Sequence, residues 1–289
     1  MSAIKHVFDV VAEHGEGPVW DAVEKQLYWV GLLKGDYLRA DIHTGEVKRF
    51  HIGQPLGVLA LREKGGLILA LRDGFALWDE ATKSLDFIHT PEKENPDTRF
   101  NDGGVDPAGR FFAGTMTFDG NRDIGNLYRL GTDHSLKKVE SSLYIPNGMA
   151  WSTDRKNFYL TDTNRHIIYV YDYDVDTGDI TNRRTFIQFD KHEFPDGLTT
   201  DTNGDFWIAL WGSSKIYRFD HQGKKVAEIP VPVQYPTSCC FGGDDLSTLF
   251  ITTSRLPLPE HEQKNQPLAG KLLMLETNVT GVAPLRFKG

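Results

Sequence analysis

The chain has 289 residues, of which 32 are basic and 40 acidic, with a net charge of -8 and a pI near 5.7. Scattered Lys and Arg on an acidic protein create no field that attracts phosphate backbones, so we expect no nucleic-acid partner. No stretch approaches the roughly 18 uncharged apolar residues that span a bilayer, and the first residues lack the apolar run of a signal peptide, so we expect a cytoplasmic protein without membrane contacts.

Six segments along the chain share one pattern, an apolar strand, a short polar turn and a second apolar strand. They begin at Gly17, Gly57, Gly104, Gly148, Gly197 and Cys240, so successive starts lie 40, 47, 44, 49 and 43 residues apart. A fixed period of this size marks propeller or solenoid folds. No 3.6-residue apolar period persists over a dozen residues, so we expect very little helix.

Each segment continues into a further hairpin with Asp, Gly, Thr or Asn at its tip, where a tight turn needs these residues. We expect the last of these hairpins from Gly270 onwards. Six units of four antiparallel strands predict an all-β, six-bladed β-propeller that forms a single domain over residues 1–289. An apolar strand from Ile4 should close the ring as the outermost strand of the sixth blade. An open solenoid fits less well, because neither end carries a polar capping repeat.

The residues just before the first strand of each blade should converge at one mouth of the central channel, because these strands line it. These positions are Glu16, Leu56, Asn101 with Asp102, Asn147, Asp196, and Ser238 with Cys239. Carboxylates gathered this closely raise one another's pKa unless a cation neutralises them. The donors are all oxygen, which favours a hard divalent ion and argues against a structural zinc site.

The dipeptide Asn147-Gly148 also has a simpler interpretation. Asn-Gly between apolar residues is a strong signal for a β-hairpin turn, and Asp196-Gly197 carries a similar signal. Because four of the six repeats place an oxygen donor in the same frame, we interpret Asn147 as a neutral oxygen ligand at a point where the chain also turns. Ordinary turn residues are the alternative.

At these residues the sequence resembles the gluconolactonase family that includes regucalcin and bacterial sugar lactonases. The resemblance covers essentially the whole chain, through EGPVW at Glu16, RFNDGGVDPAGRFFAGTM at Arg99, YIPNGMAWSTD and FPDGLTTDTNGDFWIALWG. It implies a six-bladed propeller with one divalent metal ion on the axis that hydrolyses sugar lactones. It also implies that Glu16, Asn147 and Asp196 are the metal ligands, and that Arg99 and Asn101 contact the substrate.

One loop departs from the family pattern. Some members carry a glutamate that contacts the sugar after the GTM motif, whereas this loop reads TFDGNRDIGNLY, with Asp119 and Asp123 as its only acids. The accepted pattern of sugar hydroxyls therefore stays open, as do the ring size and the identity of the sugar.

Our functional hypothesis is a metal-dependent lactonase that opens a sugar lactone to the aldonic acid, with Asp196 as the catalytic base. Ca²⁺ is our first choice of metal, and Zn²⁺, Mn²⁺, Mg²⁺ or Fe²⁺ are admitted by the same oxygens. A phosphotriesterase-like hydrolase on the same axial metal and a non-enzymatic calcium-binding or scaffold propeller are the alternatives. The expected partner is a small-molecule lactone, and the expected assembly is a monomer or a weak homodimer.

Two further features have mainly structural interpretations. The adjacent Cys239 and Cys240 cannot staple a loop, so we expect small buried thiols in a reducing compartment, with a vicinal redox pair as the alternative. Trp207 and Trp211 alternate along one strand, which favours packing between blades over stacking on a sugar.

Overall fold

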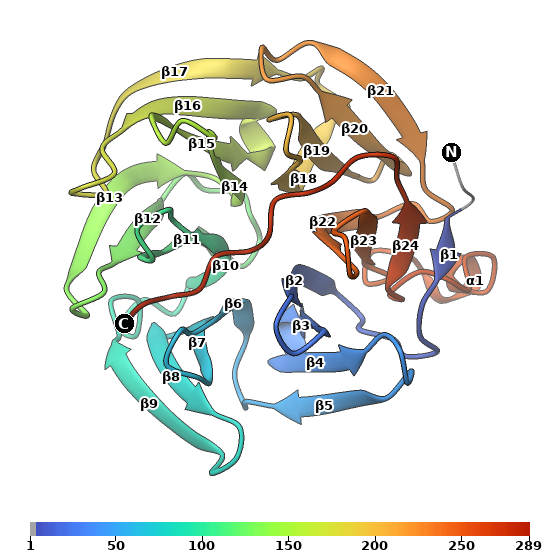
Figure 1. Cartoon of the computed structure of the whole chain (residues 1–289), viewed down its shortest axis with the longest axis horizontal. Helices are drawn as coiled ribbons and strands as arrows, with labels where there is room; N and C mark the ends of the chain where they lie inside the picture. Colours follow the sequence, from blue (N-terminus) through green and yellow to red (C-terminus); the bar gives the residue numbers. More distant parts are fainter. Residues whose placement is uncertain (1–3) are drawn as a thin grey trace.

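In the computed structural model, which describes residues 4–289, six four-stranded antiparallel sheets surround a central axis (Figure 1). The predicted six-bladed propeller is therefore confirmed. The first three blades are β2 (Gly15–Asp21), β3 (Gln26–Gly31), β4 (Asp36–Asp41) and β5 (Val47–His51); β6 (Leu56–Leu61), β7 (Leu67–Leu71), β8 (Phe75–Asp79) and β9 (Ser84–His89); and β10 (Thr98–Val105), β11 (Phe111–Thr117), β12 (Gly125–Leu130) and β13 (Leu136–Leu143).

The remaining blades follow the same order from the axis outwards. They are β14 (Pro146–Trp151), β15 (Asn157–Asp162), β16 (Ile167–Tyr173) and β17 (Ile180–Gln188); β18 (Phe194–Thr200), β19 (Phe206–Trp211), β20 (Lys215–Phe219) and β21 (Lys225–Pro230); and β22 (Pro236–Gly242), β23 (Thr248–Thr253), β24 (Leu273–Glu276) and β1 (Lys5–His6).

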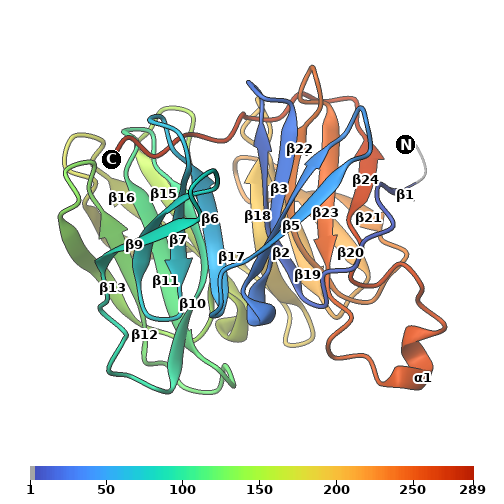
Figure 2. The same ribbon diagram turned by 90° about the horizontal axis from the view of Figure 1, so that it is seen from below.

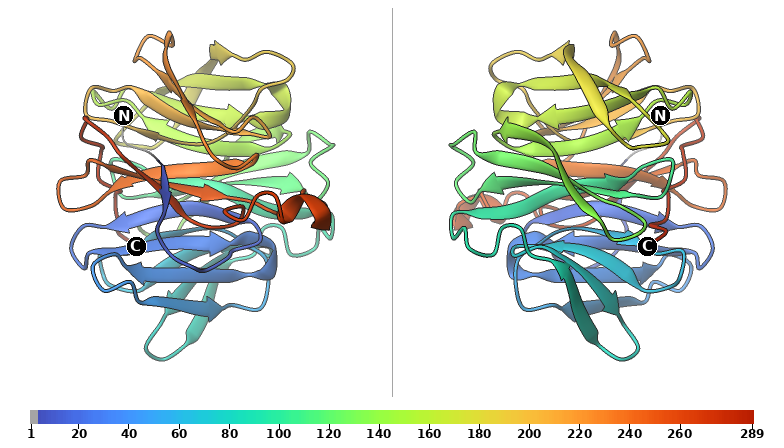
Figure 3. Two further views of the ribbon diagram at one scale, coloured as in Figure 1. Left: turned by 90° about the vertical axis from the view of Figure 1, so that its right-hand side faces the viewer. Right: turned by 90° about the vertical axis from the view of Figure 1, so that its left-hand side faces the viewer.

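Helical structure is confined to three short pieces within residues 4–289. They are the 3-10 turns η1 (Leu32–Lys34) and η2 (Thr163–Arg165) and the helix α1 (Glu260–Gln263), which stands out from the ring (Figure 2 and Figure 3). None of the helices in this part of the chain has the length and apolar character needed to cross a membrane.

The ring closes as the sequence predicts. Lys5 and His6 of β1 pair antiparallel with Met274 and Leu273 of β24, so the N-terminal strand forms the outer edge of the sixth blade. This pairing covers the backbone groups that β24 would otherwise expose.

The predicted hairpin from Gly270 does not form beyond β24. Residues 277–289, which we call the C-terminal strap, instead cross one end of the channel (Figure 1 and Figure 2). The Val282 N–H donates to the Thr200 carbonyl of the fifth blade at 3.1 Å, and the Phe287 N–H donates to the Leu61 carbonyl of the second blade at 2.9 Å. The strap therefore binds blades on both sides of the axis.

The hydrophobic core consists of six clusters, each formed by two neighbouring blades. Trp207 lies in the cluster between the fifth and sixth blades with 2% of its surface exposed, which confirms its predicted packing role. The strap also contributes to this core, because Phe287 is fully buried between the second and third blades.

The buried ring of Phe287 generates a stability prediction. Replacing it with alanine removes a large side chain from a packed core, so Phe287→Ala should lower the free energy of unfolding by about 3–5 kcal/mol. Urea denaturation followed by tryptophan fluorescence measures the change. Leu285→Ala in the same strap is the matched control, because 46% of Leu285 is exposed and its loss should cost less than about 1 kcal/mol. Equal midpoints for the two variants would show that the strap contributes no core packing.

Candidate active site on the propeller axis

A β-bulge interrupts the innermost strand of every blade at the axial position. In β14 the register shifts between Pro146 and Met149, so that Asn147 and Gly148 together face one residue of β15. The other shifts fall between Glu16 and Val19, Leu56 and Val58, Phe100 and Gly103, Pro195 and Leu198, and Pro236 and Ser238. A bulge bends its strand and redirects a side chain, and here it does so at equivalent positions of all six repeats.

Asn147-Gly148 is therefore not a hairpin turn, and our prediction that the chain turns there was wrong. The dipeptide lies inside β14, and the bulge explains why the repeat looks like a turn in sequence. Gly148 is needed for space, because a Cβ at this position would lie 2.6 Å from the Leu198 nitrogen and 2.9 Å from the Asp196 carbonyl oxygen. Neighbouring inner strands approach too closely here for any side chain.

Three carboxylates are buried together at these bulges. Glu16, Asp102 and Asp196 are 5%, 7% and 4% exposed, and the charge of each of the other two raises the pKa of Asp196. Burial is the largest cause of the shifts and, together with the charge of Asp102, it raises the pKa of Glu16 to about 8. Burial also raises the pKa of Asp102 to about 6. These side chains need positive charge if all three are to ionise.

The Asn147 amide is oriented by one defined partner. Its Nδ2 donates to Thr163 Oγ1 at 3.0 Å, and that hydroxyl donates to the Pro195 carbonyl at 2.7 Å. The amide oxygen is thereby left free: Asn147 Oδ1 and Asp196 Oδ1 are both buried and have no hydrogen-bond partner in the described structure. Two buried acceptors without donors are what an oxygen-coordinated cation would satisfy.

Arg99 is the buried cation of the cluster. Burial lowers its pKa to about 10, while the charges of Glu16 and Asp196 oppose that shift, so the guanidinium stays protonated at neutral pH. Its NH1 group donates to Asn101 Oδ1 at 2.7 Å, and Asn101 Nδ2 donates to the Pro146 carbonyl at 3.1 Å. Asn101 thus holds Arg99 and joins its strand to the next blade.

His14 belongs to the same cluster and was missed in the sequence. Burial, assisted by the charge of Arg99, lowers the pKa of its imidazole to about 3, so the ring is neutral. Its Nδ1 lies 2.9 Å from Ser254 Oγ, and its ring packs edge-on against Trp211. The spacing of two residues between His14 and Glu16 within EHGEGPVW was the available signal, since such residues share one face of a strand.

The sixth blade uses its bulge differently from the prediction. The bulged residue is Thr237, whereas Ser238 and Cys239 were expected at the axis. Thr237 Oγ1 donates to the Gly15 carbonyl at 2.6 Å, directly before Glu16. Cys239 and Cys240 are buried free thiols, as predicted.

The acids of the loop that departs from the family pattern are engaged elsewhere. Asp119 accepts hydrogen bonds from the Thr117 hydroxyl at 2.7 Å and the Asn121 N–H at 3.1 Å. Asp123 forms an ion pair with Arg165 at 3.3 Å. Each carboxylate uses one oxygen atom in these contacts.

The axial donors suit a hard divalent cation. No group of three or more His, Cys, Asp and Glu side chains within residues 4–289 is close enough to hold a metal ion alone, so a cation here needs oxygen donors of another kind, such as the amide oxygen of Asn147. Glu16, Asn147 and Asp196 would supply charged and neutral oxygen atoms, and the two unpartnered Oδ1 atoms fit that role. Open positions would remain for water and a ligand.

The chain is similar to known proteins over most of its length. Residues 14–255 match the family model described as SMP-30/Gluconolactonase/LRE-like region. A Bacillus subtilis (strain 168) protein, YvrE, named as a candidate sugar lactone lactonase, is 37% identical over 283 residues and covers 97% of each chain. Rabbit (Oryctolagus cuniculus) regucalcin is 36% identical, with 95% of each chain covered. A solved calcium-binding protein, regucalcin from Agrobacterium tumefaciens strain C58, matches with a TM-score of 0.95 and 26% identity over 99% of this chain and 97% of that one.

The Thr163 hydroxyl generates a prediction about metal affinity. Thr163→Val keeps the shape but removes the group that orients Asn147, so Ca²⁺ should bind roughly 10- to 100-fold more weakly, as measured by calorimetric titration. Asn147→Ala should weaken binding at least as much. Thr161→Val is the matched control, because the buried Thr161 hydroxyl has no hydrogen-bond partner to lose. Unchanged Ca²⁺ affinity in the Thr163 variant would refute the positioning role.

The buried carboxylates generate a prediction about pH. Glu16 and Asp196 have pKa values above their unfolded values, so the folded protein binds more protons than the unfolded chain. Without metal, these two carboxyl groups should therefore lower the free energy of unfolding as the pH rises towards about 8; unfolded His14, with an ordinary pKa of 6.5, opposes this trend until about one pH unit above that value. Saturating Ca²⁺ should reverse the trend, because it binds the ionised carboxylates.

Urea midpoints measured in chelator and in Ca²⁺ across this range test the pH prediction. Glu16→Gln removes one of the two titrating groups, so it should flatten the dependence seen in chelator. If the free energy of unfolding of the wild-type protein in chelator rises with pH, the carboxylates are already ionised and neutralised by nearby positive charge.

Proposed function

The chain belongs to the SMP-30/gluconolactonase/LRE-like family, and we propose that it is a metal-dependent hydrolase that opens the ring of a sugar lactone to give the aldonic acid. Its similarity to gluconolactonase-type relatives makes it an enzyme of the lactonase class. The similarity to proteins named regucalcin supports a divalent cation as cofactor.

One observation carries the proposal. Asn147 Oδ1 and Asp196 Oδ1 are buried without partners beside the Glu16 carboxylate, and the Arg99 guanidinium is buried in the same cluster. A structural core does not retain unpaired acceptors and like charges without compensation. A site that takes up a cation and an oxygen-rich substrate explains the whole set.

Glu16, Asn147 and Asp196 would hold the cation, which as a Lewis acid would stabilise the negative charge that develops on the lactone carbonyl oxygen. Asp196 is the carboxylate that we propose as the general base, because it is buried at the axis with one oxygen atom free of hydrogen bonds. Asp196 would take a proton from the attacking water as the water oxygen bonds to the carbonyl carbon. The ring C–O bond then breaks, and the proton passes to the ring oxygen to complete the aldonic acid.

Arg99 would bind the polar side of the substrate. Its Nε is buried and has no partner among the described residues, so it can donate one further hydrogen bond to a sugar hydroxyl or ring oxygen. Asn101 keeps the guanidinium in place by accepting from NH1. Arg99 is the charged side chain that contacts the substrate in this proposal.

The catalytic role of Asp196 predicts the behaviour of Asp196→Asn. Loss of the base should lower kcat on aldonolactones by about 100-fold or more. The measurement is acid release in a pH-stat, with the protein loaded with Ca²⁺, Mn²⁺ or Zn²⁺ and a panel of γ- and δ-aldonolactones.

Asp245→Asn provides the matched acid-to-amide control. Its carboxylate accepts from the Ser247 N–H at 3.0 Å within an exposed turn, so its activity should equal that of the wild type. Full activity of Asp196→Asn would exclude the residue as the base. No acid release from any lactone with any metal would instead favour a non-enzymatic calcium-binding propeller.

A further inference from the structure

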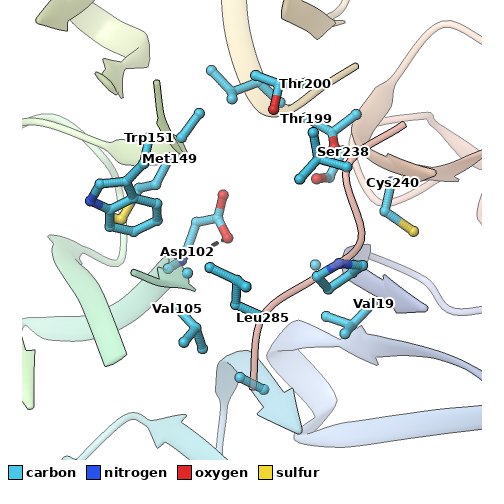
Figure 4. A pocket seen from close by; sticks show the side chains of 18 of the residues that line it. Val19, Asp102, Val105, Met149, Trp151, Thr199, Thr200, Ser238, Cys240 and Leu285 are labelled. Carbon is cyan, nitrogen blue, oxygen red and sulfur yellow. Dashed lines mark hydrogen bonds between the residues drawn. The ribbon is translucent and has the colours of Figure 1, made fainter. Parts of the chain in front are cut away.

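The channel contains a cavity between the bulges of the inner strands and the C-terminal strap, and Asp102, one of the three buried carboxylates, lies in its wall. Its volume is about 430 Å³, which lies within the range of small-molecule pockets. The strap residues 282–285 line its outer end, and the inner strands of the six blades form its walls. Figure 4 shows the side chains that face this space.

Asp102 is the acidic residue of this cavity. Its side chain projects among the lining residues (Figure 4), and its Oδ1 accepts a hydrogen bond from the Gly103 N–H at 2.7 Å. Its Oδ2 has no hydrogen-bond partner within residues 4–289, and no ion pair reaches this carboxylate, although the residue is only 7% exposed. Arg99 faces Glu16 and Asp196 and does not compensate it.

The remaining walls include an apolar side, a hydroxyl side and the solvent-exposed Arg155. Val105, Met149 and Trp151 lie together on one side of Asp102, whereas Thr199 and Ser238 lie on the other (Figure 4). The Thr199 and Ser238 side-chain hydroxyls make no hydrogen bond to any residue that the structure describes. An apolar wall with a few convergent polar groups is typical of a site for a small organic ligand.

We propose that this cavity is a second ligand-binding site, separate from the lactone site, and that it takes a small organic ammonium ion. The ammonium group would bind the free Asp102 oxygen, and the apolar body would pack against Met149 and Trp151. A bare metal ion fits less well, because one acid and an apolar wall do not supply the six or more oxygen ligands that a hard cation needs. A carboxylate or phosphate would be repelled by Asp102.

The test compares three six-carbon probes with a positive, a neutral and a negative head group: n-hexylammonium, hexan-1-ol and hexanoate. The chain has four methionines, so isotopic labelling of their methyl groups gives few NMR signals. The measurement is made at about pH 8, where the amine is protonated. In Ca²⁺-loaded protein, n-hexylammonium should shift the Met149 methyl signal and leave that of Met274, outside the cavity, unchanged. Hexanoate should shift neither.

Two variants test the charge of Asp102 and the volume of the cavity separately. Asp102→Asn should weaken n-hexylammonium binding about tenfold or more, the loss expected for a charge-assisted hydrogen bond, and should leave hexan-1-ol binding unchanged. Val19→Phe fills part of the cavity and should abolish binding of both probes. A Met274 methyl signal at its wild-type position in that variant shows that the variant is folded.

Three results would overturn the proposal. The first is no Met149 response to n-hexylammonium, which would mean that this end of the channel holds only solvent. The second is equal binding of n-hexylammonium and hexan-1-ol, and the third is undiminished n-hexylammonium binding by Asp102→Asn. None of these readouts depends on lactone hydrolysis, so a failure of this proposal would not contradict the proposed enzymatic function.

Discussion

The burial of three carboxylates at the centre of the ring is the constraint on which the rest of this structure depends. Glu16, Asp102 and Asp196 come from different blades, and each is almost completely removed from water. An unfolded chain would separate these charges, so the closed ring has to supply the energy that keeps them together. The six interblade cores provide that energy, and the pairing of β1 with β24 prevents the ring from opening.

Hydrogen bonds between neighbouring blades hold the backbone in place at the site. Asn101 donates to the Pro146 carbonyl, Thr163 donates to the Pro195 carbonyl, and Thr237 donates to the Gly15 carbonyl. In each case the accepting carbonyl belongs to the residue directly before an axial side chain. The backbone next to each of the three proposed metal ligands is therefore held by a side chain from elsewhere in the ring, and the geometry of the donors does not rest on their own strands alone.

The repeat pattern predicted the number of blades, their strand order and the closing role of the N-terminal strand, because alternation and period are local properties of sequence. The convergence of Glu16, Asn147 and Asp196 followed from the same period. The bulges could not be distinguished from turns, since both use Asn-Gly and Asp-Gly, and only strand pairing separates them. Thr163 and the strap carried no signal at all: their partners lie in other blades, and a loop residue or a short tail gives no periodicity from which a long-range contact could be inferred.

The bulge has a consequence for how such a protein can change. Every blade carries a bulge near its axial residue, whether that residue is Glu16, Leu56, Asn147 or Asp196. The deformation therefore does not depend on one kind of side chain, and Leu56 shows that a blade keeps it without a ligand atom. Evolution can add, remove or exchange donors at the axis one codon at a time while the scaffold stays the same, which allows one architecture to acquire different chemistries.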